Sequence, residues 1–173
     1  MSPLARILCL AALLLAAGTS LPLQANDASA PMTTQTESSN KERVRAAFQA
    51  WADGKGGPFA LLADDAQWTI VGRSLASRAY PDKAAFMNAV IHPFNARMAK
   101  PLRPAVRQLH ADGDTVIVFF DAQGTAIDGK PYVNTYVWIM EMHGGQATRV
   151  WAFFDAIAFN ELWTRVTPAA GTP

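Results

Sequence analysis

The sequence predicts an α+β domain in which N-terminal helices pack into a curved, mostly antiparallel sheet. In the first half of the domain, apolar residues recur at helical spacing. From Leu102 onward the apolar period changes to two, and glycine-containing turn signals divide the chain into four runs, at Asp112–Gly113, Asp128–Gly129 and Gly144–Gly145. Helices followed by consecutive hairpins are typical of this class. A sheet this long should wrap around the helices and leave a pocket between them.

Three helices are expected before the hairpins, over residues 39–54, 58–62 and 82–98. The first begins at a capping box, in which Ser39 is followed three residues later by a glutamate, and a glycine ends it. A proline opens the second helix and an aspartate caps the third. Pro93 should kink or divide the third helix, because proline lacks the N–H group that a helix interior needs.

Five strands are expected from the alternation of side chains. The first covers residues 67–71, between the second and third helices, with Trp68 and Ile70 on one face. The other four follow the third helix, over residues 103–111, 115–125, 132–142 and 147–157.

The start of the chain has the features of a secretory signal peptide, which we expect over residues 1–25. One charge at Arg6 precedes an uncharged apolar run over residues 7–17, and a helix-breaking stretch and small residues follow. The run is too short for a transmembrane anchor, since spanning a bilayer needs about 20 apolar residues. With cleavage after Ala25, the protein is expected to be exported, periplasmic or extracellular, and free of the membrane.

Signal removal leaves one domain over residues 40–166, between a disordered leader over 26–39 and a flexible tail over 167–173. Cys9 leaves with the signal, so the mature chain has no thiol for a disulfide, a metal or a nucleophile. The formal charge falls from +1 to 0, because Arg6 is the one charge removed. A neutral domain has no basic field for nucleic acid. Three scattered histidines do not make a metal site, and no cofactor is expected.

Six residues in the last third of the chain stand in a family pattern: Gly129, Tyr132, Asn134, Tyr136, Gly145 and Asp155. A Gly-x-x-Tyr-x-Asn-x-Tyr strand is followed by a glycine turn and a strand that ends in aspartate. The pattern resembles the SnoaL-like group of the nuclear-transport-factor-two-like superfamily, which implies a cone-shaped α+β barrel. The superfamily includes ketosteroid isomerases, polyketide cyclases, dehydratases, an epoxide hydrolase and binding domains with no chemistry. The fold resemblance therefore does not choose among these functions.

The resemblance also permits a comparison with the epoxide hydrolases of the group, which hold and activate a water with an Asp–Arg–Asp constellation. Asp121 falls on one of those acids. Phe119 stands at the arginine position and Ala152 at the second acid position, so the water would be neither held nor polarised. We therefore discard epoxide hydrolysis. Asp155 falls on a strand-end acid that we interpret as structural, as a helix cap.

A largely apolar pocket with a few polar groups is expected inside the cone, as is usual for a small-molecule site. Its expected residues are Trp68, His92, Phe119, Asn134, Tyr136, Ala152 and Phe154. Asn134 and Tyr136 either orient a carbonyl or hydroxyl group of a ligand or satisfy buried backbone groups and each other. His92 either reaches the mouth of the cavity or is a polar residue at a helix end.

Asp121 is the candidate catalytic residue. If it faces the cavity, as Phe119 and Gln123 then also do, loss of solvation should raise its pKa toward neutrality and let it transfer a proton at pH 7. Alternatively, Asp121 is a structural acid that is solvated or paired with Arg107. Three functions remain open: an acid/base isomerase, cyclase or dehydratase, a non-catalytic protein that binds a small hydrophobic molecule, and a protein-interaction module.

The outer face of the predicted sheet is apolar and requires a cover. It carries Val133, Thr135, Val137, Ile139, Trp151 and Phe153. The ends of the chain could provide that cover. We favour a second copy that packs sheet on sheet, as members of the resembled superfamily often do, which predicts a homodimer through this face.

Overall fold

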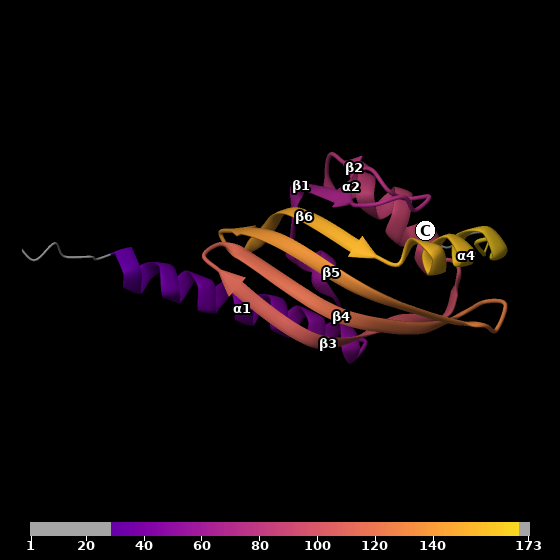
Figure 1. The fold of residues 1–173 in the computed structure, drawn as a ribbon, viewed down its shortest axis with the longest axis horizontal. Coiled ribbons are helices and arrows are strands. Elements are labelled where there is room, and N and C mark those ends of the chain that lie inside the picture. The colour runs from indigo at the N-terminus through magenta and orange to yellow at the C-terminus, as the bar shows by residue number, and fades with distance from the viewer. Residues whose placement is uncertain (1–28, 170–173) are drawn as a thin grey trace, which may run out of the picture.

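The computed structural model describes residues 29–169 and has the predicted α+β architecture (Figure 1). In chain order the elements are α1 (Ser29–Ala52), the 3₁₀-helix η1 (Pro58–Leu61), β1 (Leu62–Ile70), β2 (Ala79–Tyr80), α2 (Lys83–Phe86), the π-helix η2 (Met87–Ile91), α3 (His92–Asn95), β3 (Met98–Asp112), β4 (Thr115–Ala126), β5 (Pro131–His143), β6 (Gln146–Phe154) and α4 (Ala156–Arg165). The six strands form one sheet in the order β2-β1-β6-β5-β4-β3.

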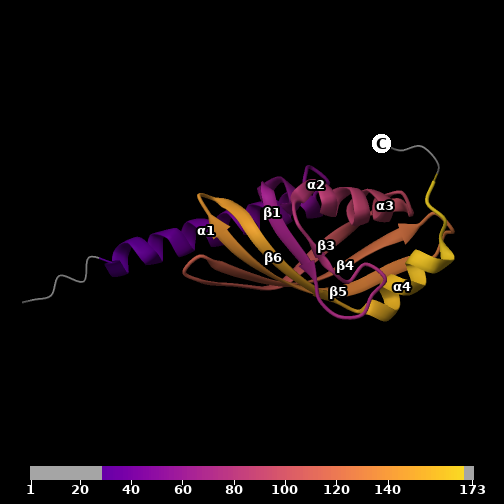
Figure 2. The same ribbon diagram turned by 90° about the horizontal axis from the view of Figure 1, so that it is seen from above.

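The sheet is antiparallel except between β1 and β6, which are parallel. The four long strands β3 to β6 form the expected meander of hairpins and curve along their length, and Figure 2 shows α2 and α3 on one side of them and α4 at one end. The prediction of helices packed into a curved, mostly antiparallel sheet is therefore confirmed. Short strand β2 had no signal in the sequence, since two residues cannot display a period.

Helix α1 packs along β3 and β4 through an apolar stripe. Val44 and Phe48 are fully buried, and the Phe48 ring lies edge-on to the rings of Phe120, at 4.9 Å between centroids, and of Trp138, at 5.5 Å. The expected start at residue 39 is wrong, because the helix begins at Ser29. Its first turns lack an apolar period, so the pattern that predicts an amphipathic helix could not reveal them.

The predicted disordered leader and the predicted flexible tail both contain structured residues. The segment predicted as a disordered leader over residues 26–39 is helical from residue 29. At the other end, one residue of the predicted tail over 167–173 is held, since the N–H of Ala169 donates to the carbonyl of Ala96 at 2.9 Å. The predicted signal peptide and residues 170–173 lie outside the described residues. Within residues 29–169, no helix combines the length and apolar character that a membrane span requires.

The predicted third helix is divided into α2, η2 and α3. Asp82 caps it as expected, because its carboxylate accepts a hydrogen bond from the N–H of Ala85 at 2.7 Å. Pro93 cannot donate to a carbonyl one turn earlier, and the backbone widens into a π-helix just before it, where the N–H of His92 donates to the carbonyl of Met87. Phe94 nevertheless remains on the buried side. The helix ends at Asn95, before the predicted residue 98.

Strand β6 ends at Phe154, before the predicted residue 157, because Asp155 starts a helix. The Asp155 carboxylate accepts hydrogen bonds from the N–H groups of Ile157 at 2.8 Å and Ala158 at 3.4 Å. This is the helix-capping role that the sequence interpretation gave to Asp155. The following helix, α4, buries Phe159 against the inner side of the sheet.

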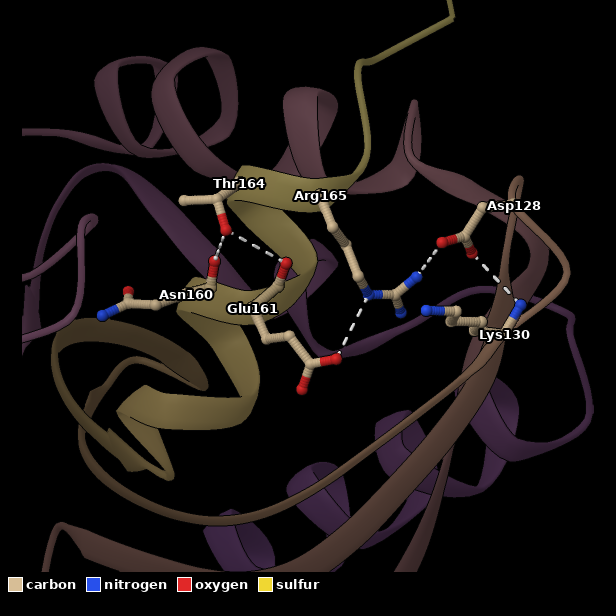
Figure 3. Close-up of polar contacts among 6 residues, drawn as sticks. All are labelled: Asp128, Lys130, Asn160, Glu161, Thr164 and Arg165. Atoms are coloured by element: carbon tan, nitrogen blue, oxygen red, sulfur yellow. Dashed lines mark hydrogen bonds and ion pairs between the residues drawn. The ribbon is translucent and has the colours of Figure 1, made fainter.

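Helix α4 is tied to the hairpin between β4 and β5 by ionic contacts (Figure 3). The Arg165 guanidinium pairs with the Asp128 carboxylate, and its Nε lies 3.6 Å from a carboxylate oxygen of Glu161. Asp128 also accepts a hydrogen bond from the N–H of Lys130 at 3.1 Å. The hydrogen bond from Arg165 lowers the pKa of Asp128. These contacts fix α4 across the end of the sheet, where its Phe159 side chain reaches the interior.

Candidate functional site

A cavity of about 340 Å³ lies between the helices and the inner face of the sheet. This volume is at the lower end of the range for small-molecule pockets, about 300–1,000 Å³. Nine of the residues around it are aromatic: Trp51, Phe59, Trp68, Phe86, Phe94, Tyr136, Trp138, Phe154 and Phe159. They come from helices α1 to α4, from η1 and from strands β1, β5 and β6, so the cavity exists only once the whole domain has packed.

The aromatic wall is held by ring-to-ring contacts. Trp68 stacks on Phe86 with 4.1 Å between ring centroids and 9° between planes, and Trp138 meets Trp68 edge-on at 4.9 Å. Tyr136 stacks on Phe120 at 4.9 Å and 9°. Such contacts stabilise large side chains beyond the burial of their area. The wall is therefore a packed, largely preformed surface.

A hydrogen-bonded network reaches the cavity at Tyr136. The Tyr136 and Tyr132 hydroxyls lie 2.9 Å apart, and the Asn134 amide nitrogen donates to the Tyr132 hydroxyl at 2.9 Å and to the Asp155 carbonyl at 3.0 Å. The Asn134 amide oxygen accepts from the N–H groups of Thr135 at 2.8 Å and Asp155 at 2.9 Å. Those two backbone donors fix the orientation of the Asn134 amide.

This orientation determines how the two hydroxyl protons can be arranged. Because Tyr132 accepts from Asn134, its own proton can go to the Tyr136 oxygen, which leaves the Tyr136 proton available. Of the two tyrosines, Tyr136 is the one that lines the cavity. Burial raises the pKa of Tyr132 and raises the pKa of Tyr136 well above its ordinary value. Both phenols therefore remain protonated at neutral pH.

Asp121 lies on the face of β4 opposite to the cavity, so the expectation that it faces the pocket is wrong. Its carboxylate accepts a hydrogen bond from the Thr135 hydroxyl at 2.7 Å, and Arg107 donates to it through Nε at 2.6 Å. The Thr135 hydrogen bond, followed by that of Arg107, holds the pKa of Asp121 below its ordinary value, where the sequence interpretation expected it to be raised. The alternative, a structural acid paired with Arg107, is correct.

The reason for this error is the composition of β4. The strand buries Val116, Val118, Phe120 and Ala122. The residues between them include Ile117 and Phe119, so both faces are apolar and alternation could not reveal which one is inside. The expected Phe119 contribution to the pocket is wrong for the same reason. Its ring lies on the outer face, 5.2 Å below the Arg107 guanidinium, and Gln123 is exposed.

The other expected pocket residues divide into two groups. Trp68, Tyr136, Ala152 and Phe154 line the cavity. Asn134 is buried behind Tyr136 and does not line the cavity. Its hydrogen bonds satisfy the backbone of Thr135 on β5 and of Asp155 at the start of α4, which was one of its two proposed roles. The expectation that His92 reaches the cavity mouth is wrong, since His92 is exposed and is not part of the wall.

Sequence reasoning missed Arg103, the only charged residue among the described residues that line the cavity. The register between β3 and β4 shifts between Lys100 and Arg103, so regular alternation fails there and consecutive residues from Pro101 to Arg103 all line the cavity. Two prolines, Pro101 at the start of this stretch and Pro104 directly after it, were the available signal of an irregular strand. In residues 29–169, no cluster of three side chains is arranged to hold a metal ion.

Comparisons with known proteins agree with this geometry. Residues 35–150 match the model of a SnoaL-like domain. The fold is similar to Bal32a from a soil-derived mobile gene cassette, with a TM-score of 0.60 and 19% identity over 74% of this chain and 98% of that one. It is also similar to TerC co-crystallised with polyporic acid, with a TM-score of 0.58 and 24% identity over 73% of this chain and 98% of that one. A third similar structure is a protein of Jannaschia sp. CCS1 assigned to the SnoaL-like polyketide cyclases, with a TM-score of 0.57 and 17% identity over 75% of this chain and 94% of that one. No significant match is found among curated proteins.

Proposed function

Because the chain belongs to the SnoaL-like domain family, we propose that it binds a small, largely aromatic molecule in the cavity without acid–base chemistry of its own. The observation that carries this proposal is the composition of the cavity wall. Nine lining residues are aromatic, and the described lining residues include no carboxylate and no imidazole. Apolar walls with few polar groups are typical of sites that bind small molecules.

Among the described residues that line the cavity, we find no group that could move a proton for the acid–base alternative. A general acid or base needs a pKa near the working pH and must lie within hydrogen-bond reach of the substrate. Asp121 is on the opposite face and has a lowered pKa, so it stays ionised and remote. Tyr136 lines the cavity, but its raised pKa keeps it protonated. It can donate a hydrogen bond but does not ionise at neutral pH.

Tyr136 would orient the ligand. In the arrangement in which the Tyr132 hydroxyl donates to Tyr136, the Tyr136 proton is available to a carbonyl or hydroxyl oxygen of the ligand. A neutral donor in an apolar wall binds such an oxygen most strongly when water is excluded. The co-crystallisation of TerC with polyporic acid supports the idea that this fold can hold a small molecule.

The first experiment is native mass spectrometry of the protein purified from its source, where we expect a co-purified small molecule. Calorimetric titration with 2-naphthamide then tests Tyr136, since Tyr136→Phe should weaken binding roughly twofold to tenfold through loss of one hydrogen bond. Tyr80→Phe is the matched control, because its hydroxyl donates to the Ala76 carbonyl at 2.7 Å away from the cavity wall. Absence of both a co-purified molecule and 2-naphthamide binding would refute the proposal, as would conversion of the co-purified molecule by the protein.

We further propose that the protein is exported and that a second copy covers the outer sheet face. Support for the dimer comes from the apolar side chains on that face, where Val133 is 57% and Phe153 is 39% exposed. The double variant Ile139→Lys with Trp151→Glu should release monomers in light scattering, since these residues are paired across β5 and β6. The control Ile157→Lys, on α4, should not change the assembly. A wild type that is monomeric at micromolar concentration contradicts the dimer.

A further inference from the structure

Arg103 sets the electrostatic character of the cavity. It is the only charged residue among the described residues of the wall, and the remaining wall is aromatic, aliphatic or neutral. It is partly exposed, whereas Trp68 and Trp138 are buried. The positive charge therefore lies toward the opening of the cavity, and the aromatic rings lie deeper.

The Arg103 guanidinium has few partners among the described residues. Its Nη1 donates to the Trp51 carbonyl at the end of α1, at 3.2 Å, and its Nη2 lies against Gly54, where a Cβ atom would come within 2.5 Å of it. No carboxylate within residues 29–169 forms an ion pair with Arg103. A guanidinium has five N–H donors, so several remain available beside the cavity.

This arrangement favours an anion over a neutral or cationic ligand. A positive charge beside an apolar wall is stabilised when a negative charge pairs with it, and a planar guanidinium matches the two oxygens of a carboxylate. The contact with the Trp51 carbonyl holds the side chain at the cavity before a ligand arrives. Gly54 permits this position, because any larger residue would displace the guanidinium.

We propose that the ligand is an aromatic carboxylic acid, with its ring system against the aromatic wall and its carboxylate on Arg103. This inference rests on the proposed function, because it names the chemical class of the molecule that the cavity binds. Arg103 contributes charge recognition at the opening, and Tyr136 contributes a neutral hydrogen bond within the wall. The two residues thus select different groups of the ligand.

The test compares 2-naphthoate with 2-naphthamide, which share a ring system and differ in charge. By calorimetry at pH 7, the wild type should bind 2-naphthoate roughly tenfold to a hundredfold more tightly than 2-naphthamide, as expected for a hydrogen bond between charged groups. Arg103→Gln should bring the ratio of the two affinities close to one, and Arg103→Lys should retain part of the preference. Arg107→Gln, an arginine on the outer face, is the control and should leave the preference unchanged.

The outcomes separate the two proposals. Equal affinity of the wild type for both probes overturns the role of Arg103 and leaves the binding function intact, and so does an unchanged preference in Arg103→Gln. Binding of neither probe refutes the proposed function and this inference with it. If Arg103→Gln fails to fold, the salt dependence of the wild type decides, because added salt should weaken binding of 2-naphthoate and not of 2-naphthamide.

Discussion

The cavity can be tested by filling it from strand β6. Ala152 lines the cavity, whereas Ala147, on the same strand, is equally buried and does not line it. Replacement of Ala152 by leucine adds three carbon atoms where the structure has space. Replacement of Ala147 by leucine forces the same atoms into a packed region. Both variants therefore carry the same Ala→Leu replacement in a buried position, and the two positions differ in whether a cavity lies beside them.

The expected magnitudes have opposite signs. At about 0.8 kcal/mol for each buried carbon, Ala152→Leu stabilises the fold by at most about 2.4 kcal/mol, and less if the added carbons fit poorly. Ala147→Leu should destabilise it by about 1–3 kcal/mol, the usual cost of overpacking. Urea denaturation followed by circular dichroism measures both values. Ala152→Leu should also abolish binding of 2-naphthamide, since it occupies the space that the ring needs.

One result would refute this reasoning. If Ala152→Leu lowers the free energy of unfolding as much as Ala147→Leu does, no usable space exists beside Ala152. The aromatic side chains would then fill the interior in solution, and a ligand would have to open the wall before it binds.

Three further predictions concern export, the outer face and the polar network. Mass spectrometry of secreted protein should find the N-terminus at Asn26, give or take a few residues, and an uncleaved chain would contradict the signal peptide. Asp121→Asn should reduce the urea midpoint at pH 7. A carboxylate whose pKa is lowered in the folded state stabilises the fold at pH values above its unfolded-state pKa of about 3.9. This contribution disappears as the pH falls through the folded-state pKa. The difference between wild type and variant should therefore vanish in acid, and a difference that persists there would count against the pairing. Asn134→Ala should destabilise the fold by about 1–3 kcal/mol, because it leaves buried backbone groups unsatisfied. A urea midpoint close to that of wild type would show that water replaces the amide.

The parts of the fold that the sequence predicts are those with local causes. Glycines at the hairpin turns, such as Gly113 and Gly129, adopt positive φ angles and mark the turns directly. Asp82 and Asp155 cap helices with their own carboxylates, so their roles follow from the residue type and its neighbours. On β5, the aromatic and amide residues at 132, 134, 136 and 138 alternate with β-branched residues, and this pattern identifies Tyr136 as an inward residue.

The parts that could not be predicted depend on tertiary packing. Arg103 lines the cavity because the register of β3 shifts, and a register shift has no period in the sequence. Asp121 follows a run that is apolar on both faces. A shift of one residue in the assumed alternation therefore moves its side chain to the other face of the sheet and reverses the expected direction of its pKa shift. The aromatic wall is assembled from elements far apart in the chain, and the sequence alone does not show which of them meet.

The π-helix η2 has a consequence for how the cavity can change in evolution. A π-helical turn behaves as an α-helix with one residue inserted, and one residue corresponds to a rotation of about 100° in an α-helix. Loss of a single residue within Met87–Ile91, together with replacement of Pro93, would restore a regular helix and keep Phe94 on the cavity side, whereas a regular α-helix of the present length would turn Phe94 away from the cavity by about 100°. The π-helix thus absorbs one residue of length and leaves both the aromatic wall and the register of the sheet unchanged.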